Sequence, residues 1–76
     1  MPDPDPVARH LEAAETHDHA AERHDKAAAF WAERGDAARA DLERRNSEIE
    51  RAAARLERDR AEVERNDPLD RVADSS

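Results

Sequence analysis

The stretch FWAERGDA, residues 30–37, lies near the middle of the chain and decides the fold. Its Gly35 is the only glycine in the sequence. Glycine readily adopts the left-handed backbone conformation that ends many helices, and an aspartate directly after it is a favourable N-cap for a new helix. The stretch therefore predicts that one helix ends at Arg34 and that a second helix begins after Asp36.

The outer ends of the two helices are marked by prolines. Asp5 followed by Pro6 is typical of an N-cap and a first helical residue, and the residue before Pro68 is disfavoured in helical geometry. These signals predict a helical hairpin over residues 7–66, with helices at about 6–34 and 37–66, a disordered N-terminal tail at 1–6 and a flexible C-terminal tail at 67–76. A single uninterrupted helix in a coiled coil is the alternative, because one glycine costs a helix only about 1 kcal/mol.

The first helix contains a repeat of seven residues with the pattern His-x-x-Ala-Ala. The repeats begin at His10, His17 and His24, and Trp31 occupies the corresponding place in the next block. Positions three, four and seven residues apart share one side of a helix. The repeat therefore predicts a packing face with the histidines and Trp31 along its centre line and alanines on either side.

The second helix carries large apolar residues at the same spacing of seven, namely Leu42, Ile49, Leu56 and Val63. An antiparallel turn at Gly35 would place each of them opposite one member of the histidine face. The expected facing pairs are Trp31 with Leu42, His24 with Ile49, His17 with Leu56, and His10 with Val63.

Composition excludes several classes of function. The chain has 76 residues, of which 43% are charged and 3% aromatic, and its net charge is −7. An acidic protein is poorly suited to the phosphate backbone of nucleic acids, so no nucleic-acid partner is expected. No run approaches the ~20 apolar residues of a membrane span, and the N-terminus is unlike a secretory leader, so we expect a cytoplasmic protein without a membrane partner.

The small size of the chain favours a partner. A domain of this length buries too little surface to be stable by core packing alone, and the absence of cysteine excludes disulfides and thiolate metal sites. We therefore expect a homodimer in which two hairpins form a four-helix bundle. A further protein partner is compatible with this expectation.

Two resemblances rest on these motifs. The HxxAA blocks followed by Trp31-Ala-Glu-Arg-Gly35-Asp36 resemble small bacterial helical-hairpin proteins rich in histidine and alanine. The segment Gly35-Asp36-Ala37-Ala38-Arg39-Ala40 is similar to the turn between the helices of a tetratricopeptide repeat. The first resemblance covers roughly residues 10–40 and the second about ten residues, and both imply a helical hairpin.

The histidines are the only group of residues that suggests chemistry. Residues seven apart on a helix are separated by about 10.5 Å, so two histidines of one chain cannot share a metal ion, and no metal or cofactor is predicted. We expect them to pack at a helix interface, where apolar neighbours would favour the neutral ring and mild acidification would cost stability. Two helices cannot enclose a catalytic pocket, so no catalytic residues and no enzymatic activity are predicted.

Phe30 and Trp31 are adjacent and point about 100° apart on a helix. Trp31 belongs to the packing face, and Phe30 is expected either to cover the turn or to anchor another protein. The candidate interface residues are therefore His10, His17, His24, Phe30, Trp31, Leu42, Ile49, Leu56 and Val63.

These observations favour a small non-enzymatic interaction protein, an adaptor or regulator that acts through the surfaces of its helices. The alternative is a helical bundle that binds metal or senses pH through its histidines.

Overall fold

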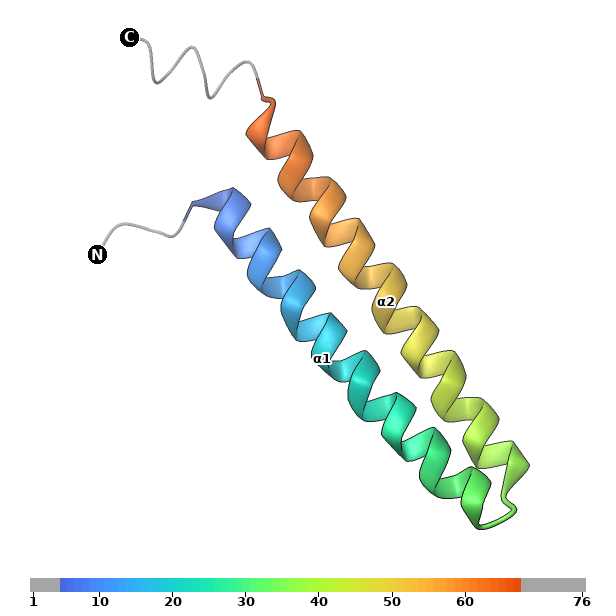
Figure 1. The fold of residues 1–76 in the computed structure, drawn as a ribbon. Coiled ribbons are helices and arrows are strands. Elements are labelled where there is room, and N and C mark those ends of the chain that lie inside the picture. Colours follow the sequence, from blue (N-terminus) through green and yellow to red (C-terminus); the bar gives the residue numbers. More distant parts are fainter. Residues whose placement is uncertain (1–4, 68–76) are drawn as a thin grey trace, which may run out of the picture.

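The computed structural model describes residues 5–67, which form two helices, α1 (Pro6–Glu33) and α2 (Ala37–Arg65). The helices lie side by side and antiparallel, with the turn at one end of the hairpin and both the start of α1 and the end of α2 at the other (Figure 1). The predicted all-α hairpin is confirmed. Each helix ends one residue before the expected position, because Arg34 and Asn66 are the C-cap residues. The expected tails lie almost entirely outside the described residues.

The turn reverses the chain in the way that residues 30–37 indicate. Gly35 has a φ of +76°, in the left-handed region. The Asp36 N–H donates to the Trp31 carbonyl at 3.0 Å, and the Gly35 N–H donates to the Ala32 carbonyl at 3.0 Å. This pair of hydrogen bonds is the Schellman arrangement, which satisfies carbonyl groups left unpaired at a helix end.

Both helices begin at an aspartate. The Asp5 carboxylate accepts a hydrogen bond from the Val7 N–H at 2.9 Å, and the Asp36 carboxylate accepts one from the Arg39 N–H at 3.0 Å. Each contact satisfies one of the backbone donors that the first turn of a helix leaves free.

The core between the helices contains only small side chains. Its members recur every seven residues on each helix, at Ala14, Ala21 and Ala28 of α1 and at Ala40, Ser47, Ala54 and Ala61 of α2. Small side chains let two helix backbones approach closely. The two helices therefore pack through close backbone contact and not through the burial of large apolar side chains.

The prediction of which α2 face packs against α1 is wrong. Leu42, Ile49, Leu56 and Val63 are between 49% and 69% exposed and do not lie in the core. The α1 face is correctly placed, but its centre line is formed by the alanines, and the histidines flank it. The expected pairing is also wrong, because His24 meets Glu43, six residues before Ile49. The physical reason is that α2 has a second heptad pattern of small residues, which permits a closer approach than leucine does.

Among the described residues, neither helix is long and apolar enough to cross a membrane.

Candidate functional site

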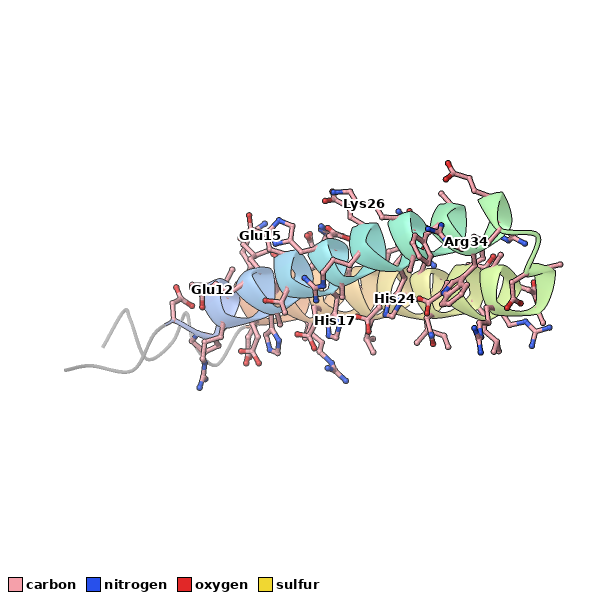
Figure 2. All side chains as sticks on the ribbon, turned by 90° about the horizontal axis from the view of Figure 1, so that it is seen from below. Glu12, Glu15, His17, His24, Lys26 and Arg34 are labelled. Atoms are coloured by element: carbon pink, nitrogen blue, oxygen red, sulfur yellow. The ribbon has the colours of Figure 1, made fainter. Side chains whose placement is uncertain are left out.

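One edge of the seam between the helices is lined by three histidine–glutamate pairs, which we call the histidine ladder. In each pair the histidine Nδ1 lies 2.6 Å from a glutamate Oε2, and the pairs are His10 with Glu57, His17 with Glu50, and His24 with Glu43. His17 and His24 point toward α2, whereas Glu12, Glu15 and Lys26 point away from it (Figure 2). The ladder thus connects the two helices at three successive levels.

The glutamates of the ladder were missed in the sequence, although their signal is present. Glu43, Glu50 and Glu57 are seven residues apart, the same spacing as the histidines. Each follows a core residue of α2 by three positions, which places it on the edge of the packing face. An acidic heptad opposite a histidine heptad is the pattern that would have identified these pairs.

The ladder is partly shielded from water. The side chain of Glu57 is 14% exposed, and that of its partner His10 is 29% exposed. The hydrogen bond with His10 is the main reason why the pKa of Glu57 lies below its ordinary value of 4.5, and a second hydrogen bond from Arg60 acts in the same direction. The local environment therefore favours the ionised carboxylate.

The neighbours of the histidines differ from those expected. Each ladder histidine faces a carboxylate from α2 and not a leucine, isoleucine or valine. The reason for expecting mild acidification to cost stability is therefore removed, because a carboxylate attracts the protonated ring.

The other edge of the seam carries ion pairs between arginine and aspartate. Asp25 receives the Arg51 guanidinium at 2.5 Å, and Asp18 pairs with Arg58. Arg51 also donates to the hydroxyl of the buried Ser47, so that this polar group of the core has a partner. The hydrogen bond from Arg51 is the main reason why the pKa of Asp25 is lowered from 3.8, and the pKa of Arg51 is raised in return.

Two aromatic rings lie beside the turn, at the end of the ladder that His24 and Glu43 form. Phe30 and Trp31 meet edge to face with ring centroids 5.1 Å apart. The guanidinium of Arg34 lies 3.5 Å from the centre of the Phe30 ring, and that of Arg39 lies 4.6 Å from the centre of the Trp31 ring. These cation–π contacts stabilise the end of the hairpin. Phe30 remains 45% exposed.

The four large apolar residues of α2 form a line on its outer surface, which we call the apolar stripe: Leu42, Ile49, Leu56 and Val63. Each stands two residues after a core residue, which turns it by about 200° and directs it away from α1. A row of large apolar side chains at helical spacing is the pattern that another helix can cover.

A shallow groove lies at the end of the stripe that is remote from the turn. Its lining combines apolar and charged side chains, namely His10, Leu56, Asp59, Arg60, Val63 and Glu64. The groove brings the stripe next to the first pair of the histidine ladder.

Within the described residues, no three histidine, aspartate or glutamate side chains lie close enough together to hold a metal ion. The ladder supplies its potential ligands two at a time, one from each helix.

No protein-family model matches this sequence, and comparisons with curated proteins and with solved structures found no match. The resemblances to histidine- and alanine-rich hairpins and to the tetratricopeptide turn therefore stay expectations.

Proposed function

We propose that this chain is a small non-enzymatic interaction protein, an adaptor or regulator in the cytoplasm, that associates with a second copy of itself through the outer surface of α2. The observation that carries this proposal is the apolar stripe. The core contains nothing larger than alanine and serine, while Leu42, Ile49, Leu56 and Val63 stay exposed in one line.

Burial energetics support self-association. Covering a large aliphatic side chain contributes roughly 1.5–3 kcal/mol. Two stripes that cover each other would supply the apolar burial that the seam of a single hairpin lacks. The assembly would contain four helices in the order α1, α2, α2, α1, because each stripe faces away from its own α1.

Sedimentation velocity at micromolar concentrations tests this proposal. We expect the wild-type chain to be a dimer and Ile49→Arg to raise the dissociation constant on the order of tenfold or more, because a charge would have to be buried. Leu11→Arg is the matched control, since Leu11 is 40% exposed but lies on α1. A wild-type chain that stays monomeric, or equal effects of the two variants, would contradict the proposal.

A second candidate function is a bundle that senses pH through its histidines, and the histidine ladder favours it. A protonated ring beside a carboxylate forms an ion pair, which is a stronger contact than the hydrogen bond of a neutral ring. Protonation of a ladder histidine would therefore strengthen its contact with α2.

Thermal unfolding at pH 7.5 and at pH 5.5 tests the second candidate. Sensing of pH by the ladder requires the melting temperature of the wild type to rise on acidification and the rise to shrink in His17→Gln, which removes the partner of Glu50. His19→Gln is the control, because His19 is exposed and lies outside the ladder. An unchanged or falling wild-type melting temperature would exclude pH sensing by this ladder.

A further inference from the structure

We propose that the second copy docks antiparallel, with α2 against α2, about a two-fold axis that passes between Ala52 and Ala53. This inference rests on the self-association proposed above and specifies its geometry. A two-fold interface requires that one surface be complementary to itself, so that each contact occurs twice. The outer surface of α2 meets this requirement in its spacing, its residue sizes and its charges.

The apolar stripe is evenly spaced about the proposed axis. Ile49 and Leu56 lie nearest to it on either side, and Leu42 and Val63 lie seven residues further out. A two-fold rotation therefore places Ile49 against the second copy's Leu56, and Leu42 against the second copy's Val63. The axis itself falls between two alanines, whose small side chains let the helices approach closely.

Charged residues beside the stripe complement each other in the same arrangement. Arg45 and Asp59 each stand three residues after a stripe member, on the same side of the stripe. The rotation brings Arg45 next to the second copy's Asp59, and this pair occurs twice. Within the hairpin, Arg45 pairs with Asp41 at 2.8 Å in an exposed contact. Asp59 has no hydrogen bond or ion pair within the described part of the chain.

The groove at the end of the stripe fits this occupant. Its lining contains Leu56, Val63 and Asp59. In the antiparallel arrangement, the second copy's Leu42 reaches the apolar part of the groove, and its Arg45 reaches Asp59. Because the arrangement is two-fold symmetric, the groove of each copy receives the same two side chains from the other copy.

Long-range charge favours the antiparallel over the parallel arrangement. The dipoles of the two α2 helices oppose each other when the helices run in opposite directions. The first residue of α1 and the last residue of α2 both lie at the end opposite the turn (Figure 1), and the stretches 1–6 and 67–76 of the sequence are each net acidic. A parallel dimer would bring four such helix ends together, whereas the antiparallel dimer keeps two at each end.

Disulfide crosslinking of the full chain tests the geometry without interference, because the sequence contains no cysteine. We expect Ala53→Cys to form disulfide-linked dimers on oxidation, since the two copies of residue 53 meet at the axis. Val63→Cys should not, because the antiparallel arrangement separates its two copies by about 32 Å along the helices. Valine and cysteine are similar in size, so this control preserves the stripe.

Charge reversal provides an independent test by sedimentation. Arg45→Asp and Asp59→Arg should each weaken the dimer roughly fivefold to tenfold, because each places like charges together twice. The double variant should return close to wild-type affinity. Circular dichroism of all three variants would verify that the hairpin itself is kept.

The outcomes separate the two proposals. A dimer in which Val63→Cys crosslinks, or in which the double charge reversal does not restore affinity, overturns the antiparallel geometry and leaves self-association intact. A chain that remains monomeric at all concentrations overturns both.

Discussion

Every buried position of the seam holds a side chain no larger than serine, and this determines which other residues can reach across it. With the helix backbones close together, the side chains at the edges of the seam meet their counterparts directly. On one edge these are histidines and glutamates, and on the other they are aspartates and arginines. The contacts along both edges of the seam thus depend on the alanines.

Enlarging a seam alanine should therefore destabilise the hairpin. Ala21 is fully buried, and Ala21→Leu would push the helices apart at a cost of about 1–3 kcal/mol in the free energy of unfolding. Ala29→Leu is the control, because Ala29 is exposed on the same helix. Urea unfolding followed by circular dichroism measures both variants. Equal stability of the two would mean that the seam is not packed as described.

Strong acid should destabilise the protein through carboxylates whose pKa values are lowered in the fold. The pKa of Glu57 is lowered from 4.5 and that of Asp25 from 3.8. Groups of this kind contribute stability above their unfolded pKa values, and the contribution is lost as the pH falls through their folded ones. We expect the free energy of unfolding to decline below about pH 4.5. Glu57→Gln should make the decline shallower, whereas Glu48→Gln, on the exposed surface of α2, should leave it unchanged.

At the level of elements, α2 is a helix with two faces that could have packed. One face carries the apolar stripe, and the other carries small residues and glutamates at the same spacing of seven. The small face meets α1 because α1 also presents alanines every seven residues, and its histidines lie where the glutamates can reach them. Large apolar residues alone would have selected the other face.

The turn between the two elements depends on one glycine. A Cβ atom added at Gly35 would meet nothing within 4 Å, so the cost of a side chain there comes from the backbone at a φ of +76°. We expect Gly35→Ala to lower the free energy of unfolding by roughly 1–2 kcal/mol, and Gly35→Asn by less, because asparagine tolerates the left-handed region better. Thermal or urea unfolding checks the order. An alanine variant as stable as the asparagine variant would contradict this account.

For the molecule as a whole, the register between the helices decides which surface remains for a partner. The seam places His24 against Glu43 and leaves Ile49 on the outside. The consequence is a hairpin whose apolar stripe is available to another chain on the outer side of α2.

Intramolecular crosslinking tests this register. A short thiol-reactive crosslinker should connect His24→Cys and Glu43→Cys within one chain, and should connect His24→Cys and Ile49→Cys poorly, since residue 49 points away from α1. Monomeric products on a denaturing gel identify intrachain crosslinks. Preferential crosslinking of 24 with 49 would restore the register expected from the apolar spacing, and crosslinking only between chains would contradict the hairpin.

Much of the fold can be predicted from local signals. Asp5, Pro6, Gly35 and Asp36 act on the backbone within a few residues of themselves, and they place both ends of α1 and the start of α2 to within one residue. The packing face of α1 also follows from its sequence, because that helix has one dominant repeat. Of the histidine ladder, only the histidines could be predicted. Its glutamates were missed because the apolar stripe, at the same spacing of seven, indicated a different packing face of α2.

The sequence by itself therefore determined two helices, their turn and the inward face of α1, because capping, glycine geometry and helical periodicity are local properties. Only the tertiary structure decided which face of α2 meets α1. That choice depends on how closely two backbones can approach and on which charges then come within hydrogen-bonding distance, and these quantities exist only once both helices are in place. The close approach of the alanines and the three histidine–glutamate contacts selected the small face and left the large apolar residues outside.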